Sequence, residues 1–270
     1  MGGSRNPWRV LLSTRWIFGH ILAGGLIVLF VACGFWQLDR LQQKRDSNEI
    51  RLEREQLPPL RPGDVAADTE LLADAAMGAE LDLRHATVTG SYQPEDELLL
   101  RSRSFNGQPG WHVLTPLLLA DGSRLLVDRG WVPYEMDETP VAAAIPPGGE
   151  VSVSGVLRVS QTPPEGIGAS FAPRDPEDGI LKAAWYVDTE RLARLQLPGL
   201  LPAAWLSLVE QSPAQPDVLP QPPELEPLDE GPHFGYAMQW FSFALVGIIG
   251  YWFLMRKVLK EAAAGGAGRG

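Results

Sequence analysis

One short segment near the C-terminus has residue types and spacing suited to holding a flat, metal-containing ring. His233, Tyr236, Ala237 and Trp240 are three or four residues apart, so a helix would place them on one face. Pro232, directly before them, is a favourable residue at the start of a helix. An imidazole nitrogen can be an axial ligand of a haem iron. His233 is therefore a candidate iron ligand, with Tyr236 and Trp240 as candidate neighbours of the ring.

The same segment also fits a simpler interpretation. Tyr, Trp and His gather where helices leave a bilayer, because each joins an apolar ring to a polar tip. His233, Tyr236 and Trp240 open a long apolar run and could form such an interfacial belt. Both interpretations stay open on these residues alone.

The run 127–133 is a second candidate site, because it combines a charged pair with glycine and tryptophan. In a strand, Arg129 and Trp131 would point to one face, and Asp128 and Gly130 to the other. Gly130 permits a close backbone approach. An arginine beside a tryptophan can stack on it or hold a carboxylate. A partner-binding role and a structural ion pair with a core tryptophan fit this pattern equally well.

Other kinds of chemistry find no positive support. The sequence contains no Gly-x-Ser-x-Gly, His-Glu-x-x-His or P-loop pattern, and its four histidines are scattered. Cys33 is the single cysteine, which excludes an intramolecular disulfide, a Cys-x-x-Cys copper or redox site and a Cys-x-x-Cys-His covalent haem site. We therefore expect a protein that is not an enzyme and has no catalytic residues.

Two apolar runs must position these side chains. Residues 17–36 and 234–255 carry no formal charge, and each is long enough as a helix to cross a bilayer core of about 30 Å. The first run is longer than the apolar part of a signal peptide and lacks a small-residue cleavage site. We expect two transmembrane helices, the first of them an uncleaved anchor.

Basic residues predict the orientation of both helices. The terminal sides of the spans carry Arg5, Arg9, Arg15, Arg256, Lys257 and Lys260, against Arg40, Lys44 and Arg45 on the other side. The positive-inside rule then places both termini in the cytoplasm. His20 would lie near the cytoplasmic surface and His233 near the outer one, separated by most of the ~30 Å core. His20 is therefore expected to be a packing or interfacial residue and not a second iron ligand.

Charge and proline content divide the rest of the chain. Residues 46–232 contain 31 acidic and 13 basic residues, a net charge of −18. Such an acidic region argues against nucleic acid as a partner. The expected organisation is a cytoplasmic N-terminus (1–16), a transmembrane helix (17–36), a juxtamembrane helix and linker (37–62), an extracytoplasmic β-rich domain (63–210), a Pro-rich tether (211–232), a second transmembrane helix (233–255) and a cytoplasmic tail (256–270).

The central domain has the pattern of a mostly β fold. Short runs rich in β-branched or aromatic residues cover 81–92, 97–102, 111–119, 124–132 and 150–159. Turn signals such as Asn106-Gly107 separate them, which predicts consecutive antiparallel strands in a small antiparallel barrel or curled sheet of an α+β domain. Asp188 can cap a short helix, residues 203–210 fit a strand or a helix, and the Pro- and Gly-rich stretch 161–179 predicts a long loop.

Six ordered segments resemble the surfeit locus protein 1 family of cytochrome c oxidase assembly factors. They are 34–40 with Lys44, 90–92, 110–116 followed by Asp121-Gly122, 127–133, 155–158 and 233–241. The resemblance runs over nearly the whole chain. It implies a non-enzymatic helper in building the oxidase's catalytic subunit, linked to delivery or retention of haem a, with haem a synthase as a further possible partner.

The resemblance also implies roles for particular residues. In bacterial members the histidine that opens the second span is implicated in haem binding, and that position is His233 here. The expected interaction residues are Trp36, Gln37, Arg40, Asp128, Arg129, Gly130 and Trp131. The family often has an asparagine two residues before the histidine, whereas this chain has Gly231.

The location follows from composition. The chain has 19 arginines against 4 lysines, and its N-terminus lacks a Ser-rich presequence. These features favour a multi-pass protein in contact with lipid in a bacterial cell membrane over a mitochondrial import substrate. The alternative function is an accessory subunit or membrane scaffold of the terminal oxidase that binds no haem.

Overall fold

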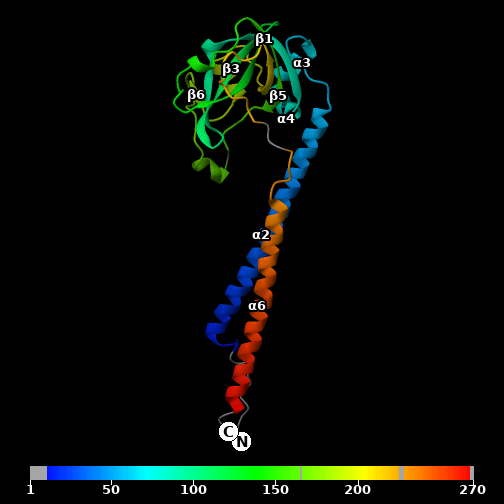
Figure 1. The fold of residues 1–270 in the computed structure, drawn as a ribbon, viewed down its shortest axis with the longest axis vertical. Coiled ribbons are helices and arrows are strands. Elements are labelled where there is room, and N and C mark those ends of the chain that lie inside the picture. Colours follow the sequence, from blue (N-terminus) through cyan, green and yellow to red (C-terminus); the bar gives the residue numbers. More distant parts are fainter. Residues whose placement is uncertain (1–10, 165, 225–227, 268–270) are drawn as a thin grey trace. The chain divides into compact units, whose positions relative to one another are not determined.

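The computed structural model describes residues 11–164, 166–224 and 228–267. The chain forms two compact units: the long helices near the two ends of the chain make one, and Arg51–Glu226 makes the other. Figure 1 shows the long helices α2 and α6 and the sheet-containing unit.

The first unit is a pair of long helices. Helix α2 spans Thr14–Glu55 and helix α6 spans His233–Ala267. Each contains an 18-residue window of high mean hydropathy, 2.2 in α2 and 1.5 in α6, so both are long and apolar enough to cross a membrane. Helix α2 continues without a break through the polar stretch after residue 36, as its sequence predicts, and ends before the prolines that begin at Pro58.

Small residues let the two helices pack closely. A Cβ added to Gly34 would lie 2.5 Å from the ring of Phe241, and Ala237 and Ala244 are almost wholly buried. The Phe35 and Phe241 rings meet edge to face with their centroids 5.4 Å apart. Close approach at glycine and alanine is typical of helices that associate where water supplies no hydrophobic driving force.

The second unit contains a curled, mixed sheet. Its strands are β1 (His85–Tyr92), β2 (Leu98–Phe105), β3 (Gln108–Leu119), β4 (Arg124–Pro133), β5 (Glu150–Val159), β6 (Ala183–Ala184) and β7 (Ala204–Ser212). Their order is β1-β5-β7-β4-β3-β2-β6, and β1 also pairs with β3. The expected purely antiparallel sheet needs correction, because β4 pairs with β7 and β2 with β6 in parallel. Each of these pairs joins strands distant in sequence, so no hairpin turn dictates their direction.

The strands themselves follow the sequence pattern closely. Five lie where β-branched and aromatic runs predict them, and residues 203–210, which fit either a strand or a helix, belong mostly to β7. Asn106 and Gly107 have φ of 50° and 76° and join β2 to β3, the positive φ values that a two-residue type I′ turn requires.

Short helices accompany the sheet. They are α3 (Ala66–Ala73), α4 (Gly78–Leu81), α5 (Thr189–Leu195) and the 3₁₀ turns η1 (Ala75–Met77), η2 (Pro94–Asp96), η3 (Ala142–Ala144) and η4 (Gly166–Ser170). Helix α5 has the expected cap, because the Asp188 carboxylate accepts a hydrogen bond from the Arg191 N–H at 2.9 Å.

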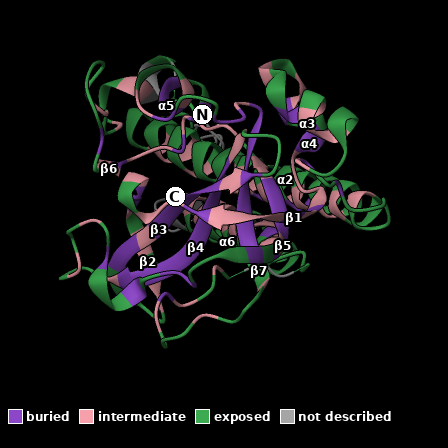
Figure 2. Ribbon diagram, turned by 90° about the horizontal axis from the view of Figure 1, so that it is seen from above, coloured by how far each residue is buried: buried purple, intermediate pink, exposed green. Residues whose placement is uncertain are grey.

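Buried residues gather along the strands, as the purple ribbon in Figure 2 shows. One hydrophobic cluster includes Val88, Val127 and Leu206 and lies among β1, β4, β5 and β7. A second includes Leu98 and Leu114 and extends to α5 through Leu192. Strand β4, which contains the candidate run 127–133, therefore lies in the middle of the packed domain.

The first half of the Pro-rich segment makes ordered contacts with the sheet domain. Its first two residues belong to β7, and Gln221 forms an isolated antiparallel bridge with Trp131 of β4. Gln215 also donates hydrogen bonds to the carbonyls of Ile145 and Leu219, at 2.9 and 3.0 Å. Glutamines between the prolines supply the hydrogen-bonding groups that proline lacks, and the first half of the segment lies on the domain.

Candidate functional site

His233 is the first residue of α6. The Tyr236 N–H donates to the Pro232 carbonyl at 3.1 Å, so Pro232 is the residue directly before the first helical turn. The half-buried His233 side chain meets helix α2, where its Nδ1 lies 2.9 Å from Oε1 of Gln37. An amide oxygen can only accept a hydrogen bond, so Nδ1 carries the proton in this contact. Nε2 then keeps its lone pair.

The other edge of the imidazole is open. Among the described residues, Nε2 of His233 has no hydrogen-bond partner. Gly231 has φ of 64°, and a Cβ there would lie 3.3 Å from Cδ2 and 3.5 Å from Nε2 of His233. Glycine at this position therefore leaves free the edge of the ring that carries the lone pair. A neutral imidazole whose Nδ1–H is held by a neighbour is the form that binds metals through Nε2.

The aromatic residues that follow His233 have different surroundings. Tyr236 is 49% exposed. Trp240 is half-buried and packs on Phe30 of α2, with the ring centroids 5.7 Å apart, and on Phe243 at 5.9 Å. Tyr236 is accessible beside His233, whereas Trp240 belongs partly to the contact between the helices.

The expected interaction residues at the end of the first apolar run have different surroundings. Gln37 joins His233, whereas Trp36 is 54% exposed and has the Arg40 guanidinium 5.9 Å from its ring centroid. Arg40 also donates to the Gln43 side chain at 2.9 Å. Trp36 and Arg40 thus remain available at the surface of this unit.

Two further contacts join α2 to the residues before α6, and the sequence analysis did not single them out. Arg45 donates two hydrogen bonds of 2.8 Å to the Glu230 carboxylate, which raise the pKa of Arg45. Asn48 donates to the Asp229 carbonyl at 2.9 Å. Opposite charges just beyond the ends of two antiparallel apolar runs were the available signal.

His20 has a separate environment, as expected for a packing residue. Its Nδ1 is hydrogen-bonded to the Tyr251 hydroxyl, and its Nε2 lies 2.9 Å from the Leu11 carbonyl oxygen. Tyr251 follows His233 by eighteen residues of α6, roughly 27 Å along a helix. Both nitrogens of His20 are engaged, and the histidine is too far from His233 to share one iron.

The second candidate run forms a buried polar network. Arg129 lies at a β-bulge, where Val113 pairs with Gly130 and Leu114 with Asp128, so the simple alternation expected of this strand is interrupted. Its guanidinium is wholly buried and lies 3.4 Å from Glu97. Burial lowers the pKa of Arg129 and raises that of Glu97, while the Val141 N–H bond to Glu97 opposes the latter.

Arg129 also contacts the Pro-rich segment. Its Nη2 donates to the Ala144 carbonyl at 2.7 Å and to the Gln215 side chain at 2.9 Å. These are the contacts of a structural ion pair. A direct partner contact stays a prediction, since the described structure gives Arg129 internal neighbours.

Gly130, Trp131 and Asp128 complete this network. Gly130 has φ of 119°, and a Cβ there would lie 1.8 Å from the Gln221 carbonyl oxygen. Trp131 exchanges two backbone hydrogen bonds with Gln221, of 2.7 and 2.9 Å. Asp128 accepts from the Gly130 N–H at 3.0 Å and lies 2.8 Å from Nδ1 of His112. The glycine of this run thus permits a close approach to another part of the same chain.

Comparisons with known proteins show which family the sequence belongs to. The model of the SURF1 family matches residues 25–245. An uncharacterized SURF1-like protein of Mycobacterium tuberculosis is 29% identical over 248 residues, covering 89% of this chain and 83% of the relative. A SURF1-like protein of Caenorhabditis elegans is 24% identical over 88% of this chain and 74% of its own length. The cytochrome oxidase assembly protein SHY1 of Saccharomyces cerevisiae is 27% identical over 44% of this chain and 28% of the yeast protein. The matched region includes the helix pair around His233, the sheet and the buried network, and the chain belongs to the SURF1 family.

Proposed function

We propose that this protein is a membrane-anchored assembly factor for cytochrome c oxidase that holds haem a through His233 while the catalytic subunit is built. Membership of the SURF1 family supports the assembly role, and one relative in yeast carries that role in its name. The observation that carries the haem assignment is the Gln37–His233 hydrogen bond, which leaves Nε2 of the imidazole open.

The membrane anchor is proposed from the surfaces of α2 and α6. Large apolar side chains on both helices are exposed, including Leu22 at 66% and Val246 at 68%. Lipid would cover these side chains, since their transfer out of water is favourable by about 25 cal/mol per Å². The basic flanks support cytoplasmic termini and an extracytoplasmic acidic domain in a bacterial cell membrane.

The residues around His233 fit a haem ligand. His233 would bind the iron through Nε2, and Gln37 would hold the imidazole in the correct tautomer and orientation. Tyr236 is half exposed beside His233 and would contact the edge of the haem macrocycle. When bound, haem a would supply the redox centre that the oxidase requires. Partners of this site are the oxidase catalytic subunit and a haem a synthase.

One absorption spectrum tests this proposal. The full chain, purified in detergent from cells that make haem a, should show a Soret band and the α-band of haem a. A colourless protein that co-purifies in equal amounts with mature oxidase would contradict haem binding and support the alternative role as accessory subunit or scaffold.

A further inference from the structure

A hollow of about 490 Å³ lies beside β2, β3 and β6, within the Arg51–Glu226 unit and independent of the His233 site. Its lining includes Arg101, Trp111, Tyr134, Arg174, Lys182 and Trp185. We propose that this hollow, the Arg101 groove, binds an acidic peptide segment of a partner protein through the carboxylates of that segment.

Arg101 is the centre of the groove. Its guanidinium carbon lies 5.2 Å from the ring centroid of Trp111 and 5.4 Å from that of Trp185. In the described part of the chain no carboxylate lies within ion-pair distance of Arg101. The two aromatic contacts restrict the guanidinium, and among the described residues its N–H donors have no hydrogen-bond partner. A planar fork of free donors is suited to a carboxylate, which it can bind with two parallel hydrogen bonds.

The aromatic wall is held in place by its own contacts. Trp111 and Tyr134 stack with their centroids 5.1 Å apart and an interplanar angle of 10°. The Trp111 Nε1–H donates to the Tyr134 carbonyl at 2.9 Å. A wall that is already ordered loses little conformational freedom when a ligand binds.

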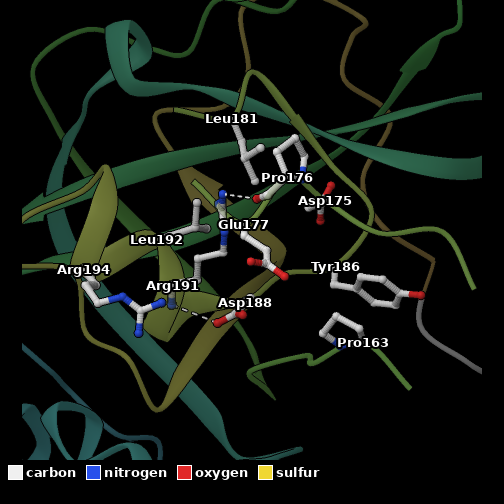
Figure 3. A pocket seen from close by; sticks show the side chains of 10 residues that line it. All are labelled: Pro163, Asp175, Pro176, Glu177, Leu181, Tyr186, Asp188, Arg191, Leu192 and Arg194. Carbon is white, nitrogen blue, oxygen red and sulfur yellow. Dashed lines mark hydrogen bonds between the residues drawn. The ribbon is translucent and has the colours of Figure 1, made fainter. Parts of the chain in front are cut away.

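A neighbouring pocket shares three lining residues with the Arg101 groove, namely Asp175, Pro176 and Leu181. The backbone N–H of Trp185 donates to both carboxylate oxygens of Asp175 at 3.0 Å. The Arg191 side chain donates to the Pro176 carbonyl at 2.6 Å. Figure 3 shows the neighbouring pocket, with the dashed bond from Arg191 to Pro176. That pocket, of about 360 Å³, is lined by three carboxylates and two arginines, so its carboxylates outnumber its cations. The hydrogen bonds fix the wall that the two hollows share.

The basic residues that line the groove favour an acidic occupant. The region 46–232 has a net charge of −18, so an acidic segment is repelled by most of this surface. Within the described residues, Arg101, Arg174 and Lys182 of the groove form no ion pairs. Of the two lining carboxylates, Asp175 is engaged with a backbone N–H and Asp137 lies exposed. An acidic peptide therefore finds three cations gathered in one hollow of an otherwise acidic domain.

Apolar side chains beside these cations favour a peptide over a bare anion. Ile180 is 76% exposed and Tyr134 58%, and both line the groove. Exposed apolar surface next to free cations matches a segment in which acidic residues alternate with aromatic or aliphatic ones. The aromatic faces of the groove would contact those side chains.

The test uses the full chain in detergent and a fluorescent, terminally blocked peptide of alternating aspartate and phenylalanine. Fluorescence anisotropy should show binding at low ionic strength and little binding when asparagine replaces aspartate. Arg101→Gln should weaken binding about tenfold, because charge-assisted hydrogen bonds are lost. Lys182→Gln, at the exposed rim where folding is not at risk, should weaken it about two- to fivefold. Arg194→Gln, which removes an exposed arginine lining the neighbouring pocket, should have no effect.

Several results would overturn the proposal. The first is no binding of the acidic peptide. The second is binding of the asparagine peptide as tight as that of the aspartate peptide. The third is an affinity for the acidic peptide in Arg101→Gln and Lys182→Gln that equals that of the wild type. Displacement of the peptide by an equal concentration of inorganic phosphate would show a simple anion site. Arg101-dependent binding to phosphatidylglycerol vesicles, without binding to the peptide, would show a lipid headgroup site. Because none of these measurements involves haem, they remain separate from the fate of the His233 assignment.

Discussion

Replacing Gly130 by alanine should release the Pro-rich segment from β4. The backbone at Gly130 has φ of 119°, and the new Cβ would lie 1.8 Å from the Gln221 carbonyl oxygen and 3.0 Å from Cα of Pro222. Both are backbone atoms, so a rotating side chain cannot relieve the clash. The segment can avoid the clash only by giving up the two hydrogen bonds that Gln221 makes with Trp131, of 2.7 and 2.9 Å.

The size of the effect follows from separate contributions. A non-glycine residue at this φ costs about 1–3 kcal/mol of backbone strain. The two backbone hydrogen bonds contribute about 0.5–1.5 kcal/mol each. Gly149→Ala is the matched control, because Gly149 also has a positive φ, of 81°, but no atom lies within 4 Å of its added Cβ. The local stability lost in Gly130→Ala beyond that control should therefore be about 1–3 kcal/mol.

Hydrogen exchange measured by mass spectrometry on the full chain tests this reasoning. Residues 213–224 and the Trp131 amide should exchange about 5- to 150-fold faster in Gly130→Ala than in Gly149→Ala, the factor that 1–3 kcal/mol represents. Equal exchange of this segment in the two variants would refute the account of Gly130 as a site of close approach within the chain.

Three further results are expected. Gln37→Leu should weaken haem binding about 10- to 100-fold while the protein still inserts, as measured by haem titration, because the partner that orients His233 is lost; unchanged affinity would contradict this. Because burial raises the pKa of Glu97, its folded form binds a proton more tightly than its unfolded form, so its contribution to stability is present below the unfolded pKa and lost as the pH rises through the folded one. Urea unfolding should show a smaller loss of stability between pH 4.5 and 7 in Glu97→Gln than in the wild type, and an equal loss would contradict the shift. In a Cys33→Ser background, Gln108→Cys should react with an impermeant maleimide in intact spheroplasts, whereas reaction only after lysis would reverse the proposed topology.

Local patterns in the sequence predict much of the fold. The strands around Val127 and Val153, the turn at Asn106 and the cap at Asp188 each depend on side chains within a few residues of one another. Such patterns are visible in a single sequence. The parallel pairing of β4 with β7 is different, because it joins segments that no local signal connects.

In the candidate site, too, local features can be predicted from the sequence and long-range contacts cannot. His233 is identifiable from its place before an apolar run, but its partner Gln37 lies 196 residues away and depends on the register of two helices. The bulge at Arg129 changes which way that strand directs its side chains, and strand periodicity assumes no bulge. The contact of Gln215 with Arg129 could not be predicted, because glutamines between prolines give no local sign of where they bind.

The most direct test of the central claim is the ratio of haem a to protein in two matched variants, His233→Ala and His20→Ala, purified from cells that make haem a. We expect His233→Ala to insert normally, since one interfacial polar side chain contributes little to a strongly apolar span, but to retain little or no haem. His20→Ala should keep the wild-type ratio, because both of its nitrogens are engaged at the other end of the helix pair. Full haem content in the His233 variant, or loss of haem in the His20 variant, would contradict the assignment of His233 as the iron ligand.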